Sequence, residues 1–348
     1  MKKRVAVIGY GGQGAWHCGQ VLKSDVVDLA GTYDIREVRR EAAKQNGIFV
    51  YENNEAIFAD KTVDIIVVAT PNDVHEDLVV NGLKSGHNVV CEKPVALSVE
   101  EFDRMCAAAK ESGKVFTVHQ NRRWDVDFRA VKQVIGSGEI GEVLRIESRI
   151  HGSRGIPSDW RGEKKHGGGM LYDWGVHLID QVMMILGFDG IKSVRCYFEH
   201  TTNFEVDDGC QLEITYKSGQ RALIEVGTLN FIPMPRFYMR AKSGTALIRD
   251  WRENAQVVKC KYWHENDVLP VQTAAGLTKT MAPRDSVTVD EYEAERPQSD
   301  VHNYYRNFVR AIDGIEPQFV THDQMRAVLK VILAGFESAE TGNTVYFD

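Results

Sequence analysis

The sequence has no long apolar run and no extended basic cluster. The first absence argues against a membrane-spanning protein, and the second argues against a nucleic-acid-binding protein. No segment approaches 18 consecutive apolar residues, the length expected of a membrane-spanning helix. The only basic run is at residues 2–4, and 49 acidic side chains outnumber 42 basic ones. We therefore expect neither a membrane nor a nucleic acid as partner. Because the basic start leads directly into a strand-like segment that a glycine loop ends, we also expect no signal peptide and a cytoplasmic location.

Paired cysteines and sequence repeats are also missing. The six cysteines are scattered, and none forms the Cys-x-x-Cys spacing of metal or redox sites, so we expect reduced residues of the core. No His-x-x-x-His pair is present, and we expect no metal, although Asp173 and His177 could supply two of the four ligands that zinc requires. With 348 residues, of which 43% are hydrophobic, the chain can form two globular domains.

A glycine-rich loop follows the first apolar strand. It reads Gly9-Tyr10-Gly11-Gly12-Gln13-Gly14, and a helix-like spacing of apolar residues comes after it. In such a loop the first glycine permits a tight turn, the second lets the backbone approach a pyrophosphate, and the third lets the helix pack on the strand. The next strand ends at Asp34, 20 residues after Gly14, where an acceptor for the ribose hydroxyls is expected. The sequence thus predicts NAD binding.

NADP remains an alternative cofactor. Asp34 would repel a 2′-phosphate, but Arg36, Arg39 and Arg40 follow closely and could accept one. We therefore favour NAD and leave NADP possible.

The pattern of strands and helices predicts an α/β chain with two domains. Residues 1–122 alternate strand and helix, including a nearly continuous apolar run at 63–69, which indicates a Rossmann domain with a doubly wound parallel sheet. Residues 123–348 are expected to form an α+β domain with an open, largely antiparallel sheet. Its expected strands cover residues 192–200, 210–216, 221–230, 236–241, 245–251 and 256–263, whereas 264–300 are expected to be loop with at most short elements.

Polar residues follow the strands of the first domain. They occur in Ala69-Thr70-Pro71-Asn72, in Glu92-Lys93-Pro94, and in the stretch from residue 120 to 125. A Rossmann fold places such strand ends on one rim, facing the nicotinamide. Asn72 can cap the helix that follows, and His75 can be either a structural residue of that helix start or part of the cofactor site.

A second glycine run, Gly167-Gly168-Gly169, precedes a segment that is apolar on nearly every side and is expected to be a buried helix. The glycines permit close approach of the backbone to a ligand. At about 100° per residue, Asp173, His177 and Asp180 fall on one polar stripe. Buried carboxylates and imidazoles need partners or a function, so the stripe is either a hydrogen-bonded core pair or part of a site.

Taken together, these motifs resemble the glucose-fructose oxidoreductase and inositol dehydrogenase family (Gfo/Idh/MocA) over the whole chain. The resemblance rests on residues 9–14, 69–72, 92–94 and 167–180. It implies that Lys93, Asp173 and His177 correspond to the family's catalytic set, and that the bond before Pro94 is often cis. It also implies that the second sheet commonly forms an oligomer interface, so a homodimer or homotetramer is expected.

The chemistry of alcohol oxidation suggests a role for each of the three residues. His177 would accept the hydroxyl proton, Asp173 would set its tautomer and raise its basicity, and the ammonium of Lys93 would stabilise the developing alkoxide. Asp180 is expected to be structural. The structural alternatives are a salt bridge between Lys93 and Glu92 or another acid, and a His177 whose hydrogen bonds are satisfied in the core.

The expected substrate is a sugar, glycoside or inositol with a secondary hydroxyl. Polar and aromatic residues that could surround the cleft suit a polyol, while the arginines leave a sugar acid possible: Arg122, Arg123, Trp124, Asp125, Trp160, Tyr172, Asn230, Arg236 and Tyr238. The expected cofactor residues are Gly9, Tyr10, Gly11, Gly12, Gln13, Gly14, Asp34, Arg36, Ala69, Thr70, Pro71, Asn72, His75, Glu92, Lys93 and Asn121.

Two functional alternatives remain open. Some relatives keep NAD bound and oxidise a sugar at position 3 to assist glycoside cleavage, and others only sense dinucleotides. An intact Lys93, Asp173 and His177 favours an oxidoreductase over a sensor.

Overall fold

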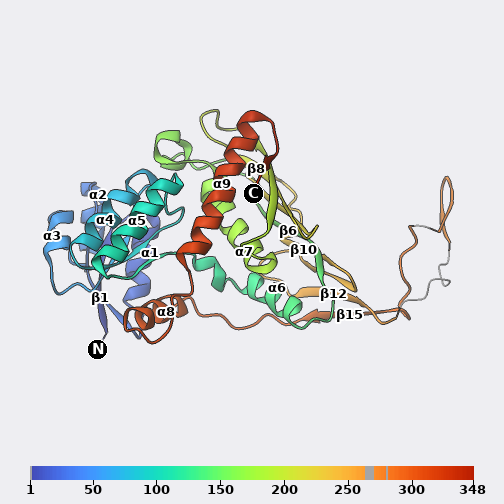
Figure 1. The fold of residues 1–348 in the computed structure, drawn as a ribbon, viewed down its shortest axis with the longest axis horizontal. Helices are drawn as coiled ribbons and strands as arrows, with labels where there is room; N and C mark the ends of the chain where they lie inside the picture. Colours follow the sequence, from blue (N-terminus) through green and yellow to red (C-terminus); the bar gives the residue numbers. More distant parts are fainter. Residues whose placement is uncertain (1, 263–269, 280) are drawn as a thin grey trace.

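The computed structural model describes residues 2–262, 270–279 and 281–348 (Figure 1). The described residues form two large sheets with helices between and around them, the first at the N-terminal end and the second toward the C-terminal end, and a separate two-stranded sheet. One end of the expected strand 256–263, residue 263, lies outside the described residues.

The first sheet is a five-stranded parallel sheet in the order β2-β1-β3-β4-β5. Its central strands are fully buried and apolar, as expected of strands covered by helices on both faces. The strands are β1 (Lys3–Ile8), β2 (Val27–Tyr33), β3 (Ile65–Val68), β4 (Asn88–Cys91) and β5 (Phe116–Val118). The helices are α1 (Gly12–Val21), α2 (Glu37–Gln45), α3 (Asn54–Ala59), α4 (His75–Lys84) and α5 (Val99–Ser112). The predicted Rossmann-type sheet is confirmed.

The second sheet has nine strands in the order β15-β12-β11-β10-β6-β9-β8-β7-β16. β6 and β9 run parallel, and the other described pairs are antiparallel, which confirms the predicted largely antiparallel sheet. The strands are β6 (Val143–His151), β7 (Ile191–Glu199), β8 (Gly209–Tyr216), β9 (Arg221–Gly227), β10 (Phe237–Ala241), β11 (Gly244–Ile248), β12 (Ala255–Cys260), β15 (Val289–Ala294) and β16 (Val345–Tyr346).

The segment expected to be loop contains more regular structure than the sequence suggested. β13 (Val271–Thr273) and β14 (Gly276–Thr278) form a short hairpin away from the main sheet, and β15 pairs with β12 at the sheet edge. The sequence did not predict β15, because its few half-buried apolar residues are separated by charged residues, as is typical of an edge strand.

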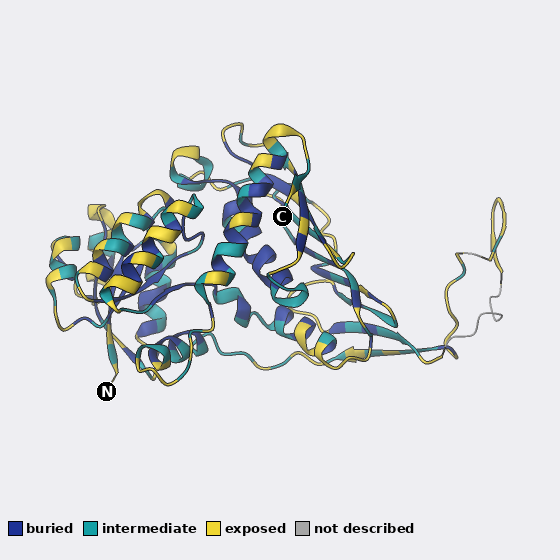
Figure 2. Cartoon of the chain, in the orientation of Figure 1, coloured by how far each residue is buried: buried dark blue, intermediate teal, exposed yellow. Residues whose placement is uncertain are grey.

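Helices from residue 126 onward lie beside the second sheet or return to the first. α6 (Val126–Gly136), α7 (Val176–Leu186) and α9 (His322–Thr341) lie on one side of the nine-stranded sheet; α6 and α9 bury an apolar face and expose polar residues, whereas α7 has no exposed residue (Figure 2). α8 (Asn303–Ile312) instead packs beside the first sheet, where Arg306 pairs with Asp25 at 2.9 Å and Asp313 pairs with Lys3 at 2.9 Å.

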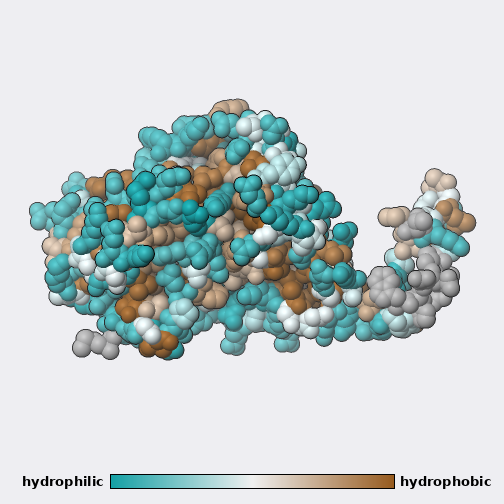
Figure 3. All heavy atoms as spheres, viewed as in Figure 1, coloured by the Kyte–Doolittle hydropathy of each residue, from teal (hydrophilic) through white to brown (hydrophobic). Residues whose placement is uncertain are grey.

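Hydrophilic residues cover most of the face of the molecule that Figure 3 shows. Among the helices of the described residues, none is both long enough and apolar enough to cross a bilayer.

Candidate active site

The glycine loop between β1 and α1 combines two crowded glycines with two open ones. Gly9 has φ +95°, and a Cβ there would lie 2.3 Å from the Ala69 carbonyl oxygen; a Cβ on Gly14 would lie 2.0 Å from the Gly9 carbonyl oxygen. Packing therefore requires both glycines. At Gly11 and Gly12 a Cβ would meet no heavy atom of the described residues within 4 Å. This open backbone at the start of α1 fits a phosphate group.

Asp34 lies at the end of β2, and its carboxylate organises the loops around it. One oxygen accepts the Tyr10 N–H at 2.8 Å, and the other accepts the Arg36 N–H at 2.8 Å. A carboxylate offers about four acceptor positions, so two remain for ribose hydroxyls. The guanidinium of Arg36 lies 3.7 Å from the same carboxylate, and Arg40 donates to the Asp34 carbonyl. Positive charge is thus close to the expected position of the 2′ substituent.

The segment after β3 joins the first sheet to the second glycine run. Asn72 begins a 3₁₀ turn (η1, Asn72–Val74), and its side-chain amide donates to the Gly167 carbonyl at 2.8 Å. The prediction that Asn72 caps a helix is therefore wrong, because its side chain is taken by a distant loop. His75 begins α4, is fully buried, and contacts the carbonyls of Pro94 and Thr70 at 3.0 and 3.1 Å. Burial lowers the pKa of His75, and its two contacts with backbone carbonyls favour the structural interpretation.

Lys93, just after β4, and Asp173, in the segment before α7, are in direct contact. The Lys93 Nζ donates to the Asp173 carboxylate at 2.9 Å and to the Asp173 carbonyl at 2.7 Å. Arg161 adds a second cation, its Nε 3.3 Å from the same carboxylate oxygen. Burial opposes ionisation of Asp173, but Lys93 and Arg161 outweigh it and lower its pKa. The side chain of Lys93 therefore forms its salt bridge with Asp173, and not with Glu92.

A π-helical turn carries Asp173. It spans Leu171–Gly175 and leads into α7 at Val176. The wider turn breaks the 100° repeat on which the predicted stripe was based. As a result the three polar residues have different partners: Asp173 binds Lys93, Asp180 binds Arg123, and His177 binds Gln120.

His177 is buried, and its Nδ1 lies 3.1 Å from Oε1 of Gln120. The expected pairing of His177 with Asp173 is therefore wrong, because Lys93 and Arg161 hold that carboxylate and Gln120 takes its place. With Nδ1–H donated to Gln120, Nε2 is the ring nitrogen left to accept a proton. Burial, with Lys93 and Arg122, lowers the pKa of His177 well below its ordinary value.

The second glycine run packs against protein and not against an open space. A Cβ on Gly167 would lie 2.5 Å from a Leu97 methyl, and one on Gly168 would lie 2.2 Å from the Arg161 carbonyl oxygen. Gly169 has φ +108°, and its Cβ would lie 2.1 Å from the Asp207 carboxylate, which accepts the Leu171 N–H at 2.7 Å. The run therefore lets three loops pack onto the start of the π turn.

The comparisons with known proteins agree with this geometry. Residues 3–120 match the model of the oxidoreductase family with an NAD-binding Rossmann fold, and residues 128–246 match the GFO/IDH/MocA C-terminal domain. The chain belongs to the Gfo/Idh/MocA family. NAD binding by the N-terminal part and a role in oxidoreduction follow from that membership.

One relative and one solved structure match the Gfo/Idh/MocA chain over almost its whole length. The scyllo-inositol 2-dehydrogenase (NADP(+)) IolW of Bacillus subtilis is 26% identical over 99% of this chain and 96% of its own. The crystal structure of an NAD-binding protein from Listeria innocua is 41% identical, with a TM-score of 0.95 and 99% of each chain covered.

Other relatives match over a shorter length. D-glucoside 3-dehydrogenase of Escherichia coli is 30% identical over 56% of this chain and 57% of its own. For several of the curated relatives the chain spans between 39 and 57% of their length.

Some residues that the sequence placed at the substrate of this Gfo/Idh/MocA chain are structural. Arg123 is buried and forms a bidentate pair with Asp180, at 2.9 and 2.6 Å, and this pairing confirms the structural interpretation of Asp180. Arg236 is also buried, 3.0 Å from Asp127, which argues against its expected place in the cleft. Neither guanidinium is free to bind a substrate, since salt bridges already hold both.

Two aromatic residues that were expected at the substrate also pack against other side chains. Trp124 packs edge-on against Tyr304 and Phe319, and Tyr172 is buried against Phe336 at a ring separation of 4.6 Å. Trp124 therefore packs against α8 and the segment before α9, and Tyr172 packs against α9.

The residues with partly exposed side chains near the Lys93–Asp173 pair are those that can meet a substrate. Arg122 stacks over Trp174 at 4.0 Å and pairs with Asp125 at 2.9 Å, and Arg161 stacks over Trp160 at 4.7 Å. The sequence pointed to Arg122 and Trp160 but missed Arg161 and Trp174, whose proximity depends on the π turn and on the loop before it.

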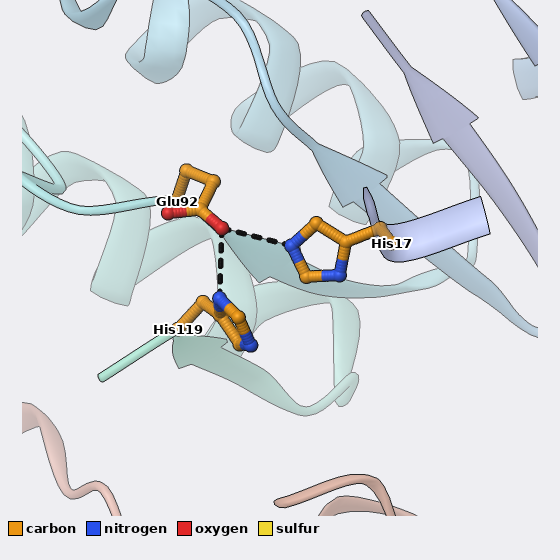
Figure 4. A group of neighbouring side chains, drawn as sticks. All are labelled: His17, Glu92 and His119. Atoms are coloured by element: carbon orange, nitrogen blue, oxygen red, sulfur yellow. Dashed lines mark hydrogen bonds and ion pairs between the residues drawn. The ribbon is translucent and has the colours of Figure 1, made fainter. Parts of the chain in front are cut away.

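A buried cluster behind Lys93 was also missed (Figure 4). The Glu92 carboxylate oxygen Oε1 contacts His17 Nε2 at 2.8 Å and His119 Nδ1 at 2.7 Å. In these three residues, which we call the Glu92 cluster, Glu92 and His119 directly follow β4 and β5, His17 lies in α1, and no short motif connects them. The donor set is one that zinc accepts, but both distances to a single oxygen are those of hydrogen bonds.

Proposed function

We propose that this chain is an NAD(P)-dependent dehydrogenase that transfers a hydride between nicotinamide and a secondary hydroxyl, or the corresponding ketone, of a sugar, glycoside or inositol. The observation that carries the proposal is the Lys93–Asp173 pair beside a neutral His177, at the carboxyl edge of the NAD-binding sheet. The names of two relatives, an inositol 2-dehydrogenase and a glucoside 3-dehydrogenase, support a polyol as substrate.

His177 is the proposed general base. Its neutral state at physiological pH gives it a lone pair, and the hydrogen bond to Gln120 directs that lone pair to Nε2. A secondary hydroxyl that loses its proton to Nε2 becomes an alkoxide, from which a hydride leaves more readily. In the reverse direction the imidazolium would return the proton to the ketone oxygen.

Lys93 is the proposed electrostatic group. The carbonyl and the carboxylate of Asp173 both accept hydrogen bonds from its ammonium, so its position is fixed before a substrate arrives. A fixed cation beside the developing alkoxide lowers the energy of the transition state more than that of the neutral alcohol. We assign Asp173 to the task of holding Lys93, and not His177, in position.

The residues of the N-terminal part fit a bound dinucleotide. Gly11 and Gly12 leave room for phosphates at the start of α1, and Asp34 keeps two acceptor positions for ribose hydroxyls. We propose NAD as the principal cofactor, with NADP possible because of Arg36 and Arg40. When bound, the nicotinamide takes up the hydride from the carbinol carbon.

For the substrate we propose contacts with Arg122, Trp160 and Arg161 around the Lys93–Asp173 pair. Tryptophan faces suit the apolar side of a sugar ring, and guanidinium groups donate to hydroxyl or carboxylate oxygens.

We also propose that the chain forms a homodimer or homotetramer through the nine-stranded sheet. Its helices lie on one side of that sheet, and the described residues place no helix on the other. Light scattering after size-exclusion chromatography should give twice or four times the mass of 39.2 kDa, and a monomer at micromolar concentration would rule out this assembly.

The function is tested by the absorbance of reduced nicotinamide. Purified protein with NAD or NADP is mixed with a panel of inositols, aldoses, glycosides and sugar acids, and each corresponding ketone is tested with the reduced cofactor. We expect turnover with at least one polyol. If no member of the panel reacts in either direction while NAD binds, the proposed substrate class is wrong.

A further inference from the structure

Glu92 carries a buried negative charge next to Lys93. The proposed roles of Lys93, Asp173 and His177 do not explain why a charge is buried there. Its carboxylate is 5% exposed and accepts three N–H groups: those of His17 and His119 on one oxygen, and the Lys93 backbone N–H at 3.2 Å on the other. An isolated buried carboxylate costs several kcal/mol, so its ionisation depends on these donors.

Both imidazoles donate an N–H group to the Glu92 carboxylate. A carboxylate only accepts, so each histidine presents an N–H to it, and the other nitrogen of His17 then accepts the Tyr305 hydroxyl at 2.6 Å. Burial, with the nearby His119, lowers the pKa of His17 to about 4, which makes it neutral at physiological pH. For Glu92 burial acts in the opposite sense, but His119 and His17 hold its pKa well below the ordinary value.

The Glu92 cluster is connected to His177 by consecutive residues. His119 contacts Glu92, and the next residue, Gln120, contacts His177. The charged and titratable groups that act on His177 are Lys93 and Arg122, which oppose its protonation, Glu92, which favours it, and His119, which opposes it. Among these groups Glu92 is the anion that favours protonation of His177, while the Asp173 carboxylate is paired with Lys93 and Arg161.

We infer that Glu92 is an electrostatic positioning residue for the proposed dehydrogenase: its buried carboxylate, fixed by His17 and His119, offsets Lys93 and Arg122 around His177. A neutral glutamine at position 92 could keep the same hydrogen bonds, since its side-chain oxygen can accept the N–H groups of His17 and His119. What glutamine lacks is the charge, without which His177 would be a weaker base. The inference rests on the proposed function, because it assigns His177 the role of base.

The test compares pH profiles of kcat/KM for the wild type, Glu92→Gln and Glu92→Asp, with a substrate found by the panel above. In Glu92→Gln we expect the acid limb to move down by about one pH unit and the plateau to fall about tenfold, because His177 loses a favourable charge and basicity. Glu92→Asp keeps the charge, so its limb should stay at the wild-type position even if the rate falls. A purely structural Glu92 would lower the rate in both variants without moving either limb.

Two further variants calibrate the comparison. Arg122→Gln removes a cation near His177, so its limb should move up. Glu76→Gln removes a carboxylate on the surface of α4, paired with Arg104, and should leave the profile unchanged. Melting temperature and NAD affinity show whether each variant is folded. If Glu92→Gln does not fold, a limb that moves down in Glu92→Asp would overturn the inference. An unmoved limb in Glu92→Asp supports it only together with the upward shift in Arg122→Gln, because without that shift the charges around His177 do not set its pKa, and the inference is overturned.

A spectroscopic measurement separates this inference from the proposed function. The His177 imidazole is followed by NMR during a pH titration and assigned by its loss in His177→Gln. A midpoint for the wild type above that of Glu92→Gln supports the inference even if no substrate is found, whereas a midpoint that is not higher overturns it. Equimolar zinc in the purified protein, lost in Glu92→Gln, would also overturn it, because the cluster would then be a metal site.

Discussion

At the residue scale, the partners of each catalytic group are set by competition for a few charges. The Asp173 carboxylate pairs with two cations, Lys93 and Arg161, and not with His177. Gln120 fills that position without a charge, so His177 stays neutral among cations. The identity of Lys93, Asp173 and His177 as a group could be predicted from motifs, but their pairing could not, because Arg161 and Gln120 approach from distant segments.

The cofactor preference also depends on one residue. Replacing Asp34 by alanine removes the repulsion of a 2′-phosphate and leaves Arg36 and Arg40 to attract it. We expect the ratio of kcat/KM for NAD to that for NADP to fall at least about tenfold. Dissociation constants from fluorescence titration check the effect on binding alone. Glu41→Ala, an exposed change on α2, is the control, and an unchanged ratio in Asp34→Ala would refute this role for Asp34.

At the scale of elements, the helix after the second glycine run shows where a sequence pattern stops being informative. Its apolar residues predicted a buried helix, and α7 is one. A π turn, however, changes the angular repeat without any marker in the sequence, because it depends on the tertiary contacts of Asp173 and on the anchoring of Leu171 by Asp207. The residues of the expected stripe, Asp173, His177 and Asp180, contact different partners, whereas the crowding at Gly9 and Gly14 agrees with the prediction for the glycine loop.

The glycine at the start of this π turn should be intolerant of a side chain. Gly169→Ala places a Cβ 2.1 Å from Asp207 Oδ1 at φ +108°, so we expect a loss of more than about 2 kcal/mol in the free energy of unfolding. Gly190→Ala is the matched control, since it also has positive φ, +74°, but meets no described atom within 4 Å, and it should cost about 1 kcal/mol. Urea denaturation of both variants measures the difference, and equal losses would show that crowding by Asp207 is unimportant.

Asp207 should make stability fall as pH rises. Burial raises the pKa of this carboxyl to about 8, whereas in the unfolded chain it is near 3.8. The folded state therefore binds the extra proton between these values, and stability decreases from pH 4 to 8. Asp207→Asn removes that contribution, so the difference in unfolding free energy between pH 5 and pH 8 should shrink by more than about 1.4 kcal/mol, the equivalent of one pKa unit. Denaturant titrations at both pH values test this, and an unaltered pH dependence would contradict it.

At the scale of the whole molecule, the site exists because the two sheets are held together by later parts of the chain. Lys93 and the NAD-binding loop belong to the first sheet, and Asp173 and His177 belong to the helical layer of the second. α8 returns to the first sheet and places Tyr305 on His17. Strand and helix patterns were sufficient to predict both sheets. The return of α8 depends on a contact between residues 288 apart, and the Glu92 cluster on contacts between residues 75 and 27 apart, which no local pattern encodes.

The central claim is that an ammonium at this junction assists hydride transfer, and Lys93→Met tests it most directly. Methionine keeps the length and packing of the side chain but not the charge, so NAD affinity should stay within about threefold of the wild type while turnover falls at least about 100-fold. Lys84→Met, on the exposed end of α4, is the control and should have no effect. The measurement is the rate of nicotinamide reduction at saturating substrate. A Lys93→Met protein with the wild-type rate would contradict the account.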